Sequence, residues 1–210
     1  MTLRTASSTT AWVALATGLA SILASLLIIL FYTVGGPFGT LNDIFNGIGS
    51  ILSSALAWKL FSDFRMYSSF LNRFTLSLAL IAAIIAVIGS ILIIFDITGW
   101  VLAGWYTTVG NALIGIWLLT FSLFARQNNL LPANLSTFGI IVGSIMAVGI
   151  MAILGILMSI DSMESTPWYI SVGFLGFLGS YLLYPLWALW SGRILLYRYN
   201  QNSSHLANSL

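Results

Sequence analysis

The sequence predicts an all-α integral membrane protein with six transmembrane helices arranged as three antiparallel hairpins. The first observation is composition, because 59% of the 210 residues are hydrophobic and only 6% are charged, whereas a soluble domain is about 25% charged. The second is a series of six apolar stretches, each near the roughly 20 residues that cross a bilayer. The third is a segregation of basic and acidic residues between alternate connections.

The predicted spans follow one another through short connections, so consecutive helices should be antiparallel neighbours. The first apolar stretch follows Arg4, as in a signal peptide, but it exceeds the roughly 7–15 apolar residues of such a signal. We therefore expect a retained first span. Residues 1–198 are predicted to form a single six-helix membrane domain, and residues 199–210 a polar, disordered cytoplasmic tail. The spans are predicted near 11–34, 40–61, 74–95, 100–125, 135–159 and 168–195.

The charges predict the orientation of the protein in the membrane. Six spans place all seven basic residues on one side and four of the five acidic residues on the other. Lys and Arg mark cytoplasmic connections, so we expect both termini in the cytoplasm and the protein in the plasma (inner) membrane. No basic run indicates nucleic acid as a partner. The basic residues are Arg4, Lys59, Arg65, Arg73, Arg126, Arg193 and Arg198, and the four acids are Asp43, Asp96, Asp161 and Glu164.

The second span carries a polar stripe at helical spacing. At about 100° per residue, Asn42, Asn46 and Ser50 share one face, while Ile44 and Ile48 lie on the opposite face. Polar groups that face lipid remain without hydrogen bonds at a cost of several kcal/mol. The stripe is therefore expected to face other helices or a water-filled cavity.

Asp43 has two interpretations at the start of this span. The stretch from Thr40 to Asp43 has the spacing of a capping box, and a carboxylate in the first turn also meets the positive end of the helix dipole. On this interpretation Thr40 caps the helix and Asp43 is structural. In the other, Asp43 belongs to a polar site with Asn42 and Asn46, and Asn111 of the fourth span is the expected partner of Asn46.

The remaining spans divide into two kinds. The fourth and sixth also carry stripes of polar and small residues, so the even-numbered helices are expected to meet at the centre, with the odd-numbered helices behind them. Such stripes are equally typical of ordinary helix packing in lipid. The third span has a weaker stripe of small residues, and the first has Gly18, Ser21 and Ser25. The fifth has Gly139, Gly143 and Ala147 at four-residue spacing, which fits close packing against a membrane partner or a second copy of the chain.

The hairpins show signs of an internal repeat. The segment "LLIILFYTVG" (26–35) aligns without gaps with "SILIIFDITG" (90–99), and Lys59, Arg126 and Arg193 recur at equal intervals. A triplicated two-helix repeat would explain this pattern. Three hairpins of equal length that obey the positive-inside rule would explain the basic residues equally well.

The residue inventory excludes several classes of enzyme. The chain has no cysteine, and its one histidine, His205, lies in the polar tail. Zinc hydrolases need His or Cys ligands, and a serine hydrolase triad needs a histidine beside the nucleophile. We expect no enzyme activity, no cofactor and no metal ion.

Three classes of function remain. The preferred one is binding or permeation of a small neutral, cationic or amphipathic molecule through an outward-facing pocket between the even-numbered helices, as in a transporter. The second is a non-catalytic accessory subunit of a larger membrane complex. The least favoured is a membrane enzyme that uses Asp43 with Asp96 or Asp161. The predicted ligand-binding residues are Asn42, Asp43, Asn46 and Asn111, with Trp105 and Tyr169 near the mouth.

Overall fold

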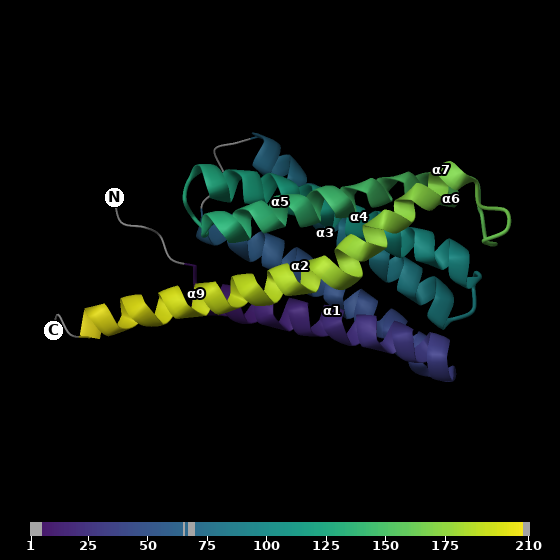
Figure 1. The fold of residues 1–210 in the computed structure, drawn as a ribbon, viewed down its shortest axis with the longest axis horizontal. Helices are drawn as coiled ribbons and strands as arrows, with labels where there is room; N and C mark the ends of the chain where they lie inside the picture. Colours follow the sequence, from purple (N-terminus) through teal and green to yellow (C-terminus); the bar gives the residue numbers. More distant parts are fainter. Residues whose placement is uncertain (1–5, 65, 67–69, 208–210) are drawn as a thin grey trace.

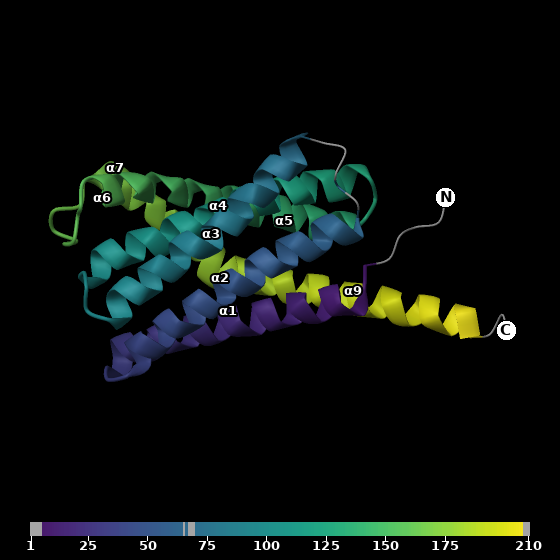
Figure 2. The same ribbon diagram turned by 180° about the vertical axis from the view of Figure 1, so that it is seen from behind.

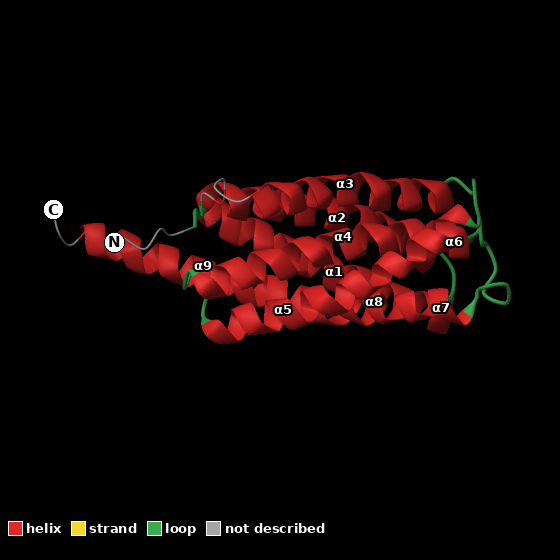
Figure 3. Cartoon of the chain, turned by 90° about the horizontal axis from the view of Figure 1, so that it is seen from above, coloured by secondary structure: helices red, strands yellow, loops and turns green. Residues whose placement is uncertain are grey.

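The computed structural model describes residues 6–64, 66 and 70–207, and these residues form an all-helical bundle (Figure 1, Figure 3). Six of the described helices are long and apolar enough to cross a membrane. The prediction of an all-helical multi-pass membrane protein is therefore confirmed at this level. Arg4, Arg65 and residues 208–210 lie outside the described part of the chain, as does the side chain of His205.

The helices alternate in direction along the bundle, as Figure 1 shows. The fifth span is α5 continued through a 3-10 turn into α6, and the sixth is a broken helix that runs from α7 to α9. The long helices are α1 (Ser8–Val34), α2 (Phe38–Asp63), α3 (Phe70–Ile94), α4 (Trp100–Gln127), α5 (Ala133–Val148) and α9 (Tyr184–Ala207). The shorter elements are η2 (Gly149–Ala152), α6 (Ile153–Leu157), α7 (Trp168–Ser171), η3 (Val172–Phe174), α8 (Leu175–Phe177) and the π-helical stretch η4 (Leu178–Leu183).

Helices that follow one another in the sequence also pack against one another. Contacts join α1 to α2, α2 to α3, α3 to α4 and α4 to α5, while α9 returns to pack along α1 (Figure 2). We use the term acidic end for the end of the bundle where α1 meets α2 and α3 meets α4. The other end, where α2, α4 and α9 carry Lys59, Arg126 and Arg193, is the basic end.

The burial of the helices agrees with the predicted division for α2 and α4, but the sixth span is buried little more than the fifth and packs along α1. In the most apolar stretch of each span, 61% of the residues of α4 and 50% of those of α2 are buried, against 28% for α1 and α3. The polar stripe of α2 faces inward as predicted, because Asn42 and Ser50 are buried while Ile44 and Ile48 are exposed. Polar and small residues therefore mark the faces that pack inside the bundle.

The predicted start of α2 is wrong. The helix begins at Phe38 and is preceded by Pro37, which already has helical dihedral angles (φ −74°, ψ −3°) and makes no side-chain cap hydrogen bond. Proline favours the first turn of a helix because its fixed φ suits that turn and its missing N–H is not needed there. Thr40 therefore lies inside the helix, and Asp43 lies beyond its first turn. The capping interpretation of Asp43 fails for this reason.

The glycine stripe of α5 packs against other helices of the same chain. Gly139 and Gly143 are buried, and a Cβ atom at Gly143 would stand 2.5 Å from the backbone nitrogen of Leu119 in α4. A Cβ atom at Gly139 would overlap the hydroxyl of Ser122 and approach the indole of Trp187. The stripe thus allows α4 and α5 to approach closely, and it faces the interior of this chain.

The last helix is longer than the sequence predicts. We expect disorder from residue 199, but α9 continues without a break to Ala207 and extends past the ends of the other helices (Figure 1). The guanidinium of Arg198 donates a hydrogen bond of 2.6 Å to the carbonyl of Leu130. This contact ties α9 to the connection between α4 and α5 at the basic end.

Candidate functional site

A cavity of about 230 Å³ lies at the acidic end of the bundle. We call it the outer cavity. It is enclosed by α1, α2, α3, α4 and the sixth span, so two odd-numbered helices contribute to it alongside the predicted even-numbered ones. Its lining residues are Ile28, Tyr32, Asn42, Asp43, Asn46, Gly89, Ile93, Trp100, Ala103, Gly104, Thr107, Phe174, Phe177 and Tyr181.

Two asparagines of α2 form the polar floor of the outer cavity. The Asn42 amide donates a hydrogen bond of 2.7 Å to the carbonyl of Ala24 in α1. The Asn46 amide donates to the Asn42 side-chain oxygen at 3.0 Å and to the Tyr181 hydroxyl at 2.7 Å. Asn46 faces the bundle as predicted, but its partner on another helix is Tyr181 of the sixth span. The expected partner, Asn111, makes no hydrogen bond with it among the described residues.

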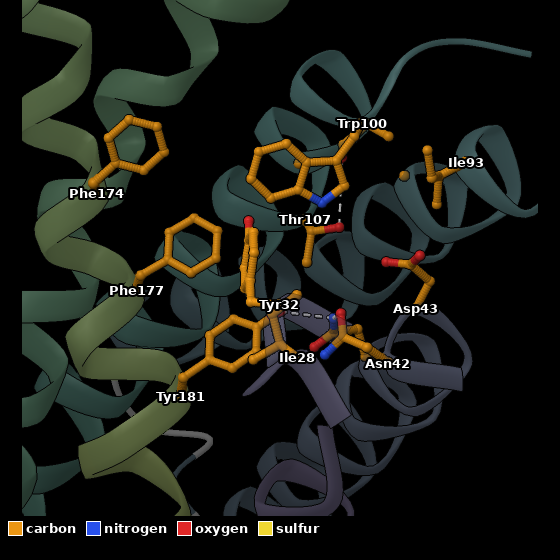
Figure 4. A pocket seen from close by; sticks show the side chains of 14 residues that line it. Ile28, Tyr32, Asn42, Asp43, Ile93, Trp100, Thr107, Phe174, Phe177 and Tyr181 are labelled. Carbon is orange, nitrogen blue, oxygen red and sulfur yellow. Dashed lines mark hydrogen bonds between the residues drawn. The ribbon is translucent and has the colours of Figure 1, made fainter. Parts of the chain in front are cut away.

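Asp43 is the one charged residue on the cavity wall. Its side chain is partly buried and lies on the α2 side of the cavity, with Phe174, Phe177 and Tyr181 on the other side (Figure 4). No hydrogen bond or ion pair joins the Asp43 carboxylate to any other residue that the structure describes. The described basic side chains lie toward the opposite ends of their helices. Among the described residues, no cationic side chain thus lies beside the carboxylate.

Aromatic rings form most of the remaining wall. In the sixth span, Phe174, Phe177 and Tyr181 follow one another along the cavity, with ring centroids 5.9 Å and 5.2 Å apart. Across from them, Tyr32 of α1 meets Trp100 of α4 edge to face at 6.2 Å. Faces of aromatic rings attract cations within about 6 Å of the ring centroid. An unpaired carboxylate and several rings therefore line the same space.

A second, smaller space lies deeper in the bundle. This inner chamber has a volume of about 20 Å³, and it shares Asn46 and Tyr181 with the outer cavity. Asn111 belongs here. The other lining residues are Ser21, Ala24, Phe45, Gly49, Ser50, Ser53, Ser180 and Tyr184.

The two aromatic residues predicted at the mouth lie elsewhere. Trp105 is buried, and its indole N–H donates a hydrogen bond of 3.1 Å to the carbonyl of Ile160. Tyr169 is exposed and does not line the outer cavity. The outer cavity is lined instead by Trp100 and by Tyr181, which lies beside Asn46, and the sequence did not predict either of them as a site residue. Tyr181 lies three residues before Tyr184 in the sixth span, and only the register of that span determines which of the two tyrosines lines the outer cavity.

The other acidic residues at this end do not join Asp43. Both oxygens of Asp161 accept backbone hydrogen bonds at the start of α4, from Gly99 at 2.7 Å and from Leu102 at 3.0 Å. Asp96 is exposed in the turn after α3, with a left-handed backbone (φ 56°). Among the described residues, no three His, Cys, Asp or Glu side chains come together as metal ligands would.

The outer cavity is thus a small, largely aromatic site with two amides and one unpaired carboxylate. Such a combination can hold a ligand that is apolar over most of its surface and polar or cationic at one point. Comparisons with protein-family models, with curated proteins and with solved structures find no match for this chain.

Proposed function

We propose that this protein binds a small amphipathic cation in the outer cavity, as a receptor-like binding protein or as the first step of transport. The observation that carries the proposal is the Asp43 carboxylate, which lines the cavity without a hydrogen bond or ion pair to any described residue. Removing a carboxylate from water without a partner is costly. A ligand cation would supply that partner.

The rest of the cavity suits the same ligand. The rings of Trp100, Phe177 and Tyr181 offer faces for a cation or an apolar body, and a desolvated cation over such a ring gains about 2 kcal/mol. An anion would meet Asp43 and no basic side chain. The volume of about 230 Å³ lies below the roughly 300–1,000 Å³ of clefts that take drug-sized ligands, so the ligand should be small.

The proposed orientation follows from the distribution of charge. Seven basic residues gather toward one side of the six spans, and basic connections remain in the cytoplasm. On this basis both termini are cytoplasmic, the membrane is the plasma (inner) membrane, and the outer cavity opens to the outside. We propose a binding protein rather than an enzyme. Both oxygens of Asp161 accept backbone hydrogen bonds, which disfavours this residue as a catalytic partner of Asp43.

The test is binding to the purified protein in detergent or nanodiscs, measured by calorimetry. Choline carries a quaternary ammonium group, and 3,3-dimethylbutan-1-ol is its uncharged isostere of nearly the same shape. We expect choline to bind at least about tenfold more tightly than the alcohol, a difference of about 1.4 kcal/mol. Asp43→Asn should abolish this preference.

The matched control is Glu164→Gln, which removes one negative charge from an exposed connection at the same end of the bundle. This variant should retain the preference for choline. Equal binding of choline and the alcohol to the unmodified protein would overturn the proposal. An Asp43→Asn variant with an undiminished preference would overturn it as well.

A further inference from the structure

The hydrogen bond between Asn46 and Tyr181 separates the outer cavity from the inner chamber. Both residues line both spaces, and the bond between the Asn46 amide and the Tyr181 hydroxyl is 2.7 Å long. One side of this pair faces the aromatic wall and Asp43. The other side faces a polar space deeper in the bundle.

The inner chamber carries polar groups that lack partners. Among the described residues, the buried Tyr184 hydroxyl has no hydrogen-bond partner, and the Asn111 side chain has none either. Buried polar groups of this kind are usually satisfied by ordered water. A volume of about 20 Å³ exceeds the roughly 10–15 Å³ that a water molecule requires. The chamber therefore has the size and the chemistry of a water site.

Tyr181 lies where the sixth span lacks a regular helical hydrogen bond. Pro185 has no N–H, so it cannot donate the usual helical hydrogen bond to the carbonyl four residues earlier, which is that of Tyr181. The hydroxyl of Ser25 on α1 donates to this carbonyl instead, at 2.6 Å. The residue also belongs to the π-helical stretch η4, and such stretches are frequent at functional sites.

Hydrogen bonds from two other helices thus hold both the backbone and the side chain of Tyr181. Ser25 binds its backbone carbonyl and Asn46 binds its side-chain hydroxyl. Gly176 and Gly179 precede it and lie close to α5 and the turn that follows it. The position of Tyr181 therefore depends on hydrogen bonds to α1 and α2.

We propose that Tyr181 is a gate, and that water passes from the outer cavity into the inner chamber when its hydrogen bond to Asn46 opens. The inner chamber is then a water-binding site near the middle of the membrane, served by Asn111 and Tyr184. This inference goes beyond the proposed binding of a cation and does not depend on it, because its test uses no ligand.

The test uses the absence of cysteine from the chain. Ser53 lines the inner chamber and is buried, so Ser53→Cys places a single thiol behind the gate. The probe is 2-hydroxyethyl methanethiosulfonate, a small, uncharged and water-soluble thiol reagent. Tyr181→Phe removes the hydroxyl but keeps the ring that stacks on Phe177. We expect slow modification with Tyr181 intact and about a tenfold faster rate in Tyr181→Phe, which corresponds to a hydrogen bond of about 1.4 kcal/mol.

Two further variants decide between a gate and general loosening. Asn46→Ala removes the other partner of the same bond and should raise the rate in the same way, which also provides a second route if Tyr181→Phe fails to fold. Ser21→Ala removes a hydroxyl from the same chamber without touching that bond, because the Ser21 hydroxyl donates to the carbonyl of Thr17 in its own helix, and should leave the rate unchanged.

A cysteine at Thr107, in the wall of the outer cavity, should react rapidly in every background. Equal rates at Ser53→Cys with and without the Tyr181 hydroxyl, whether fast or slow, would overturn the gate. An equal acceleration by Ser21→Ala would overturn it too.

Discussion

We predict that the side chain of Asp161 stabilises the start of α4 through two hydrogen bonds. Its two oxygens accept from the backbone N–H groups of Gly99 and Leu102 at 2.7 Å and 3.0 Å. These donors have no helical partner, because the first turn of a helix leaves its N–H groups free. Asp161 comes from the connection between α6 and α7, so this cap also ties that connection to α4.

The loss of stability expected in Asp161→Ala follows from these two hydrogen bonds. Removing a side chain that caps a helix costs about 0.5–2 kcal/mol, and the attraction between a carboxylate and the helix dipole adds about 0.3–1 kcal/mol. Asp161 is exposed, so water competes for the same groups and the highest values do not apply. We expect Asp161→Ala to cost about 1–2 kcal/mol, which lowers the Tm by about 2–8 °C for a chain of this size.

The assay is thermal unfolding of the purified protein in detergent, followed by loss of the monodisperse peak in size-exclusion chromatography. Glu164→Gln is the matched control, because Glu164 is exposed in the same connection and its loss should leave the Tm unchanged. Gly99→Ala is a second route to the same interaction, since its Cβ atom would stand 2.5 Å from an oxygen of Asp161. The double variant should lose little more than either single variant. Additive losses, or an Asp161→Ala variant as stable as the control, would refute the cap.

Two further predictions follow from topology and packing. A single cysteine at Met163 should react with a membrane-impermeant reagent added outside intact cells, while one at Asn128 should not, and the reverse pattern would invert the proposed orientation. Gly143→Ala should lower the Tm through a clash with the backbone of α4, at a cost of about 1–3 kcal/mol. Gly104→Ala is its control, because no atom beyond the adjacent turns of its own helix lies within 4 Å of its new Cβ atom. A Gly143→Ala protein as stable as the Gly104→Ala protein would show that α4 and α5 are not packed as described.

The general plan of the bundle was predictable because it depends on properties summed over many residues. Each span is a stretch of some twenty mostly apolar residues, and no single error in one residue removes such a stretch. The inward face of α2 was equally predictable, since Asn42 cannot face lipid without an unsatisfied amide and is buried in the structure. Composition and periodicity therefore indicate which faces are inside.

The partners across the bundle were not predictable, because they depend on the relative heights and rotations of two helices. Asn46 was expected to meet Asn111 and instead meets Tyr181. The π-helical stretch η4 alters the rotation of the sixth span at that level, and no simple periodicity reveals it. Trp105 likewise points away from the outer cavity, because the carbonyl of Ile160 in a distant connection accepts its indole N–H.

The start of α2 shows a third kind of failure. Thr40 and Asp43 have the spacing of a capping box, but Pro37 takes the N-cap position and the helix begins at Phe38, two residues before Thr40. Two local signals compete there, and the fixed backbone of proline decides between them. The same shift leaves Asp43 free to line the outer cavity.

The central burial of α4 has a consequence for how the protein is synthesised. Chains leave the ribosome from the N-terminus, so α4 enters the membrane before α5 and the sixth span exist. Trp117 and Gly143 lie on buried surfaces that join α4 to those later segments. Until the last third of the chain has been translated, one side of α4 must face lipid or the insertion machinery. The first four helices are therefore expected to form an incomplete scaffold, and the outer cavity to acquire its aromatic wall only when Phe174, Phe177 and Tyr181 dock in the final step of assembly.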